Sequence, residues 1–200
     1  MASSKRSRRD FFRSVLQVGS AAAVAFTARA SLADHYKVPS GSMEPTVHVG
    51  DHIVVAKMAY GLRVPMTDTY FVHFAGPVRG DVVVLEHPEG EENNGARDAD
   101  VVGSVLLKRV VAVEGDLVEV RGGHVRIDDR EVPEARISLE SGGGPDLGPV
   151  LVPRGKVLVR GDNRGNSRDG RFFGWVDRER ILGRAVTVIA RDGRLSSLPL

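Results

Sequence analysis

Residues 105–113 read Val-Leu-Leu-Lys-Arg-Val-Val-Ala-Val, an apolar run interrupted by one lysine and one arginine. A short run rich in β-branched residues predicts a β-strand. This run is one of a series of short valine-rich runs after residue 34. They lie at 47–56, 81–86, 104–113, 117–120, 124–127, 156–160 and 185–190, and they are bounded by Gly, Pro, Asp or Asn. The pattern predicts a mainly β, antiparallel domain without long helices, with hairpin turns at 121–124 and 128–130.

The bulk composition excludes several classes of function. The 200 residues contain 28 Lys+Arg and 26 Asp+Glu, a formal net charge of +2, and the basic excess is concentrated in residues 1–13. The rest of the chain is close to neutral, so we expect no nucleic-acid surface. The chain has no cysteine, which excludes disulfides, thiol catalysis and cysteine metal sites.

The first 33 residues have the composition of a segment that meets a membrane. Residues 1–10 are basic and polar, and 11–33 form a largely apolar stretch of a length that can span a bilayer if its two arginines snorkel to the interfaces. This predicts a single-pass anchor at 11–33, with 1–10 in the cytoplasm and 34–200 outside it. Two alternatives stay open: a twin-arginine export signal (7–12) cleaved after 31–33, or an Ala-rich amphipathic or buried helix.

A candidate nucleophile follows this stretch in the segment Pro39-Ser-Gly-Ser-Met-Glu-Pro-Thr46. A serine nucleophile needs a base and donors for the oxyanion. The histidines at 35, 48, 52, 73, 87 and 124 show no triad signature. His48 and His52 are four residues apart, but Gly50 lies between them and no carboxylate completes a ligand set, so we predict no metal site.

A lysine kept neutral by burial is the other base that can serve a serine. In a strand, Leu106, Lys108, Val110 and Ala112 share one face, which would surround the amine with apolar groups. The alternative is a lysine on the outer face of an edge strand. No lysine follows a serine by three residues, which excludes the β-lactamase type of Ser-Lys pair.

Three further segments carry a local prediction. Residues 161–176 are dense in Asp, Asn, Arg and Ser and end in aromatic residues, which predicts an internally bonded loop followed by an aromatic strand. Residues 88–101 are acidic and predict a solvated loop. Residues 141–148 are glycine-rich, but no Gly-Lys-Ser/Thr follows, so we expect a flexible linker and not a phosphate loop.

Four blocks of the sequence together resemble type I signal peptidases, bacterial membrane-anchored serine proteases with a Ser/Lys dyad. The blocks occur in the family's order between residues 38 and 176: Pro39-Ser-Gly-Ser-Met-Glu-Pro-Thr46, Arg79-Gly-Asp-Val-Val-Val84, Leu107-Lys-Arg-Val-Val-Ala-Val-Glu-Gly-Asp116 and Gly161-Asp-Asn-Arg-Gly-Asn-Ser-Arg-Asp-Gly-Arg171. The resemblance implies a signal-peptidase-like β domain with a small β insert, here at 117–155.

The resemblance also implies a role for each matching residue. Ser42 would be the nucleophile and Lys108 the general base. The hydroxyl of Ser40 and the backbone N–H of Ser42 would form the oxyanion hole, and Ser167 would form a hydrogen bond with Lys108 and orient it. The remaining implied residues are the ion pair Asp169 and Arg171, and the substrate-pocket residues Val38, Pro39, Met43 and Leu107.

The implied reaction is cleavage after Ala-X-Ala in exported preproteins, through an acyl-enzyme, at the bacterial inner membrane. The implied partners are preprotein signal peptides and the lipid bilayer, and no cofactor is needed. Two alternatives remain: a specialised Ser/Lys processing peptidase of the pilus or conjugation type, and a non-catalytic membrane-tethered β module.

Overall fold

The computed structural model describes residues 15, 17, 19, 20, 33–63, 70–88, 105–134, 136–140 and 142–200. The predicted anchor at 11–33 and the basic segment 1–10 therefore lie almost wholly outside the described residues. Ala33, which the sequence analysis placed at the end of the anchor, instead begins a strand. Within the described ranges, no helix has both the length and the apolar character needed to cross a membrane.

Short strands make up most of the regular structure. The strands are β1 (Ala33–Lys37), β2 (His52–Ala56), β3 (Gly61–Arg63), β4 (Tyr70–His73), β5 (Val82–Glu86), β6 (Val105–Val113), β7 (Leu117–Arg121), β8 (His124–Ile127), β9 (Arg130–Glu131), β10 (Leu147–Leu151), β11 (Lys156–Arg160), β12 (Val176–Asp177), β13 (Ile181–Arg191) and β14 (Arg194–Pro199). The helical pieces are η1 (Lys57–Ala59), α2 (Gly170–Phe173) and η3 (Arg178–Arg180). The prediction of a mainly β domain is confirmed.

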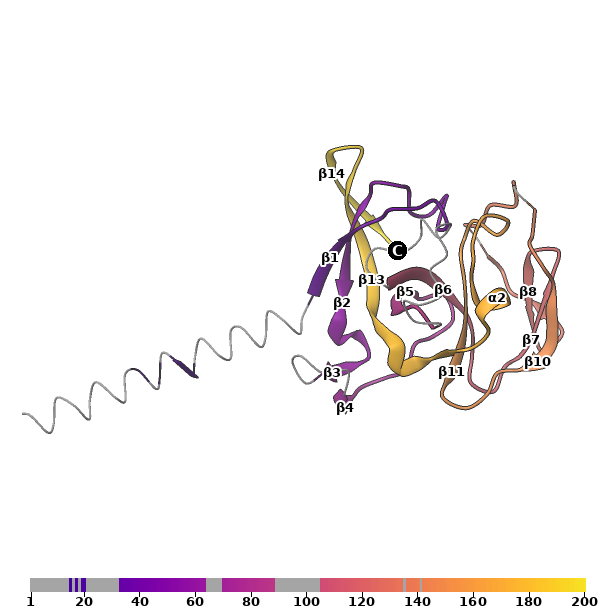
Figure 1. Ribbon diagram of the computed structural model, residues 1–200, viewed down its shortest axis with the longest axis horizontal. Helices are drawn as coiled ribbons and strands as arrows, with labels where there is room; N and C mark the ends of the chain where they lie inside the picture. Colours follow the sequence, from indigo (N-terminus) through magenta and orange to yellow (C-terminus); the bar gives the residue numbers. More distant parts are fainter. Residues whose placement is uncertain are drawn as a thin grey trace, which may run out of the picture.

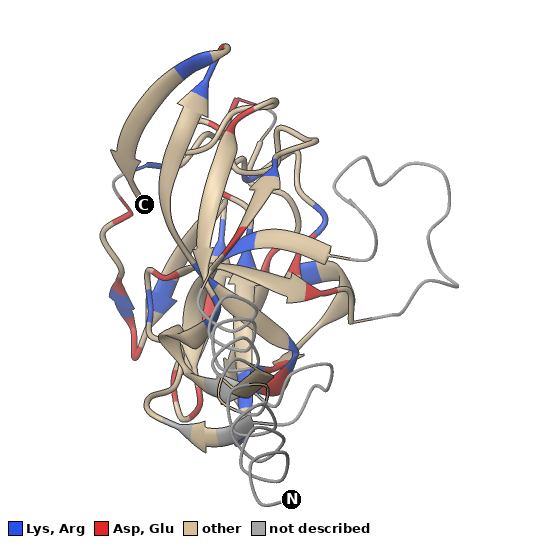
Figure 2. Ribbon diagram, turned by 90° about the vertical axis from the view of Figure 1, so that its left-hand side faces the viewer, with Lys and Arg blue, Asp and Glu red and all other residues tan. Residues whose placement is uncertain are grey.

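The strands form one large sheet and one small sheet. The large sheet has the order β1-β2-β13-β5-β6-β11-β12, with β14 paired to β13, and the small sheet has the order β10-β7-β8-β9. Their strand pairs are antiparallel. Figure 1 shows the small sheet at one side of the large one. The strands β3 and β4 pair separately as a hairpin. Figure 2 shows that basic and acidic residues are interspersed over the strands.

The strand β6 lies inside the large sheet, between β5 and β11. Alternate side chains of a strand point to opposite faces, and Leu106, Lys108 and Val110 are buried on one face of β6. Lys108 has an exposed fraction of 0%. The alternative of a lysine on the outer face of an edge strand is therefore wrong.

Two predicted segments differ from the structure. The strand expected at 47–56 begins only at His52, because the chain before it forms a turn in which Val47 N–H donates to the Met43 carbonyl. The expected aromatic strand after the polar block is the short helix α2, which Asp169 caps by accepting from Arg171 N–H. A local side-chain cap of this kind favours a helix start over a strand.

Candidate active site

Ser42 and Lys108 meet at the centre of the large sheet. The two side chains come from the nucleophile loop, which we define as residues 39–51, and from β6. Lys108 Nζ lies 2.7 Å from Ser42 Oγ, and Ser42 is only 4% exposed. Met43 and Val47 anchor the loop, since both are buried in the apolar cluster under it. The hydroxyl and the amine are thus held in contact away from bulk water.

The two other serines of the expected site lie close to the nucleophile. Ser40 Oγ is 3.5 Å from Ser42 Oγ, so its hydroxyl faces the reacting atom. Ser167 is buried, but its hydroxyl has no hydrogen-bond partner among the described residues. The expected hydrogen bond from Ser167 to Lys108 is therefore not formed. Ser167 packs instead against the backbone of Gly161.

The loop after β11 is bonded directly to the nucleophile loop. Asn163 N–H donates to the Ser42 carbonyl at 3.0 Å, and the Asn163 side-chain amide donates to the Gly41 carbonyl at 3.2 Å. Asp162, which is fully buried, accepts from the Thr46 hydroxyl at 2.5 Å. These bonds fix the backbone on both sides of Ser42. The sequence analysis missed this role, although both residues belong to the polar block at 161–176.

Arg109 extends this network to β6. Its guanidinium donates to both carboxylate oxygens of Asp162, at 2.8 and 2.7 Å, and to the Gly80 carbonyl at 2.6 Å. Burial acts to lower the pKa of Arg109, but the hydrogen bond and charge of Asp162 outweigh it, and the pKa is raised. Arg109 directly follows Lys108 in β6. The hydrogen bonds from Arg109 and Thr46 to Asp162 therefore connect β6, which carries the Lys108 amine, with the nucleophile loop, which carries the Ser42 hydroxyl.

A second ion pair holds the far end of the nucleophile loop. Arg191 Nη2 lies 2.6 Å from Asp51 Oδ2 and also donates to the Thr46 carbonyl at 3.2 Å. Burial acts to raise the pKa of Asp51, but the bonds and charge of Arg191 and the His48 N–H outweigh it, so the pKa is lowered. The nucleophile loop is therefore fixed by the Asp162 and Asp51 carboxylates.

Asp169 and Arg171 form the expected ion pair. Arg171 Nε and Nη2 each lie 2.8 Å from a different oxygen of Asp169, and both side chains are 0% exposed. The Asp169 carboxylate also accepts from the Gly161 N–H at 3.1 Å. Arg171 donates further to the Gly143 carbonyl. The pair thus ties the loop that carries Ser167 to the segment expected to be a flexible linker, which instead packs against buried side chains.

Arg160 and Arg164 lie beside this pair. The guanidinium of each donates to the Gly123 carbonyl, at 2.7 and 2.8 Å. Arg164 also pairs with Glu134. Burial, together with the charges of Arg164 and Arg171, lowers the pKa of Arg160 to about 9. The Gly123 carbonyl, in the turn between β7 and β8, therefore binds one arginine at the end of β11 and one in the loop that follows it.

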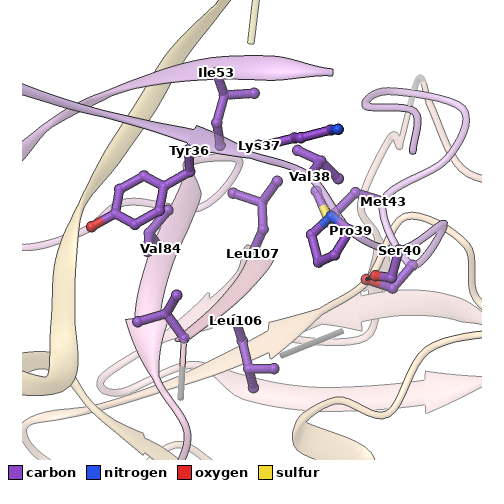
Figure 3. Close-up of a pocket in the computed structure, with 12 residues that line it drawn as sticks. Tyr36, Lys37, Val38, Pro39, Ser40, Met43, Ile53, Val84, Leu106 and Leu107 are labelled. Atoms are coloured by element: carbon purple, nitrogen blue, oxygen red, sulfur yellow. Dashed lines mark hydrogen bonds between the residues drawn. The ribbon is translucent and has the colours of Figure 1, made fainter. Parts of the chain in front are cut away.

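A small apolar cavity adjoins Ser42. It has a volume of about 30 Å³, and one water needs roughly 10–15 Å³ on this measure. Figure 3 shows Leu107 between Tyr36 and Pro39 in this cavity. The walls include the four expected residues Val38, Pro39, Met43 and Leu107, and also Tyr36, Ile53, Val84, Val105 and Leu106, which the sequence analysis did not name. The cavity has room for a methyl-sized side chain and not for a large one.

The described residues contain no cluster of three or more His, Cys, Asp or Glu that could hold a metal ion. The donors that approach Ser42 are an amine, a hydroxyl and backbone groups. The chemistry that this arrangement supports is nucleophilic attack by a serine assisted by a lysine.

Comparison with known proteins gives one family. The family model described as "Signal peptidase, peptidase S26" matches residues 11–190. Signal peptidase I of Leptolyngbya laminosa is 33% identical over 201 residues, covering 98% of this chain and 88% of that protein. Signal peptidase I of Pseudomonas aeruginosa is 30% identical, covering 86% and 70%. Thylakoidal processing peptidase 1, chloroplastic, of Arabidopsis thaliana is 36% identical, covering 83% and 44%.

Proposed function

The chain belongs to the peptidase S26 family of signal peptidases, and we propose that it removes signal peptides from exported preproteins through a dyad of Ser42 and Lys108. It is a serine endopeptidase and not the non-catalytic β module considered from the sequence. The observation that carries the proposed dyad is the 2.7 Å contact between the Lys108 amine and the Ser42 hydroxyl, both buried.

The proposed reaction begins with proton transfer from Ser42 Oγ to the side-chain nitrogen of Lys108. The oxygen attacks the carbonyl carbon of the last signal-peptide residue, and the Ser42 N–H and the Ser40 hydroxyl stabilise the oxyanion. The Lys108 ammonium then gives its proton to the leaving amine as the C–N bond breaks, and an acyl-enzyme remains. Lys108 next takes a proton from the water that attacks the ester, and returns it to Ser42 Oγ as the ester C–O bond breaks.

The small cavity supports a preference for alanine-like side chains before the scissile bond. Its volume of about 30 Å³ accepts a methyl group, whereas a larger side chain would have to displace core residues, which is costly in a close-packed interior. We therefore propose cleavage after Ala-X-Ala-like sequences. We also propose that residues 11–33 anchor the chain in the bacterial inner membrane, with the catalytic domain outside the cytoplasm.

The test uses the full chain in detergent and a synthetic preprotein with an Ala-X-Ala site. Ser42→Ala and Lys108→Ala should each abolish cleavage, and both should still unfold in urea in one cooperative transition, as the wild type does. The matched control is Lys156→Ala, which removes a half-exposed lysine paired with Asp177 and should leave the rate unchanged. Cleavage at the wild-type rate by either dyad variant would refute the assignment.

A further inference from the structure

A larger groove lies beyond the dyad, outside the substrate cavity described above. It has a volume of about 440 Å³, which is within the range of roughly 300–1,000 Å³ of ligand sites. One wall comes from the large sheet (Gly80 and Arg109 to Val111), and the others come from the chain after β9, including Arg136, and from the end of β14. Its lining combines apolar residues with a few charged ones, as is typical of a binding site.

The substrate cavity, the dyad and the groove follow one another along β6. Residues 105–107 line the cavity, Lys108 contacts the nucleophile, and residues 109–111 line the groove. A strand advances about 3.3 Å per residue, so the groove begins within about 3–10 Å of the level of Lys108. The nucleophile loop has the same order, because 39–43 meet the cavity and the Thr46 hydroxyl lies 3.4 Å from the Arg136 carbonyl.

Among the described residues that line the groove, Arg136 is the cation without an ion pair. Asp162 neutralises Arg109, and Arg164 neutralises the groove residue Glu134. Arg136 is exposed and makes no ion pair with any described residue. An extended peptide that occupies the cavity and passes Ser42 would therefore bring its next residues toward the guanidinium of Arg136.

We propose that this groove binds the segment of the preprotein that follows the scissile bond, and that Arg136 favours an acidic side chain within its first four residues. The inference rests on the proposed function, since it assigns the second half of the same substrate. Arg136 contacts no reacting group, so its effect falls on substrate binding and appears in KM more than in kcat.

The test is a set of synthetic preproteins that differ only in the four positions after the cleavage site. Each position carries Glu, Gln or Lys in turn, and the quantity measured is the ratio of kcat/KM for the Glu and Lys versions. An exposed ion pair is worth about 0.2–1 kcal/mol, so attraction and repulsion together predict a ratio of about two to thirty at one or more positions. This ratio should fall toward one in 1 M salt, because salt screens exposed charges.

Variants of the enzyme test whether Arg136 causes this preference for an acidic side chain. Arg136→Gln should bring the ratio close to one, and Arg136→Glu should reverse it in favour of the Lys substrate. Arg154→Glu is the control, because the Arg154 side chain is 95% exposed and lies outside the groove, and it should keep the wild-type ratio. Because the ratio compares two substrates with one enzyme, partial misfolding of a variant cancels.

Two results would overturn the inference: a wild-type ratio of one at all four positions, or an unchanged ratio in Arg136→Glu. Either result with normal cleavage of the Gln substrates would leave the dyad assignment intact. If the wild type cut none of the substrates, the proposed function would fail, and the groove assignment would fail with it.

Discussion

Gly161→Ala is predicted to displace the nucleophile without touching any of the groups that react. An added Cβ at this position would lie 2.3 Å from Ser167 Oγ and 2.5 Å from the Ser42 carbonyl oxygen. Ordinary van der Waals contact begins near 3.4 Å, so the neighbours would have to move by roughly 1 Å. The Ser42 carbonyl is already fixed by the Asn163 N–H at 3.0 Å.

The expected losses of activity and of stability can be estimated from this steric overlap. A displacement of about 1 Å in a catalytic group can cost about 10²-fold in rate, and overpacking a buried site costs about 1–3 kcal/mol of stability. We expect kcat to fall by about 100-fold, with a smaller change in KM, because Gly161 does not line the small cavity. The variant should remain folded, since a loss of about 1–3 kcal/mol leaves most domains of this size stable.

The assay compares kcat for a synthetic preprotein and the urea unfolding midpoint of the full chain in detergent. Gly76→Ala is the matched control, because a Cβ there meets no atom within 4 Å and the backbone φ is not positive. It should keep wild-type values in both measurements. A folded Gly161→Ala enzyme with kcat within threefold of wild type would refute the reasoning, since the nucleophile would then tolerate the displacement.

Three further outcomes are expected. Asp169→Asn should lower the free energy of unfolding by about 3–5 kcal/mol, because it leaves the buried guanidinium of Arg171 without its counter-charge. Arg121→Gln, which removes the exposed arginine of a pair with Glu119, should cost less than about 1 kcal/mol in urea titrations. Because the pKa of Asp51 is lowered in the folded chain, its ionised carboxylate stabilises the fold at pH values above the ordinary pKa of 3.8. This stabilisation is lost as the pH falls through the lowered pKa. Asp51→Asn should therefore show a shallower loss of unfolding free energy than wild type between about pH 5 and pH 2, and equal slopes would contradict this. Ser40→Ala should reduce kcat by about 10²–10³ through loss of one oxyanion donor, and full activity in a cleavage assay would remove Ser40 from the site.

The local sequence pattern was sufficient to predict strands and the apolar environment of Lys108. The alternation around Leu106, Lys108 and Val110 predicts a shared face from the twofold period of a strand alone, and the structure buries all three. The segment at 172–173 was predicted wrongly as a strand, because its aromatic residues have high strand propensity but the preceding Asp169 caps a helical turn. A cap depends on side-chain geometry that composition does not encode.

The sequence by itself determined the β class and, through four ordered motifs, predicted the pair Ser42 and Lys108. Only the tertiary structure decided how they are held. The proposed dyad joins residues 66 positions apart, the Thr46–Asp162 bond joins residues 116 apart, and the Asp51–Arg191 pair joins residues 140 apart. The structure alone also shows that the Ser167 hydroxyl has no hydrogen-bond partner among the described residues. Periodicity reports which face a side chain occupies, whereas a contact between distant segments depends on strand order and on where each loop packs, and neither is a local property of the chain.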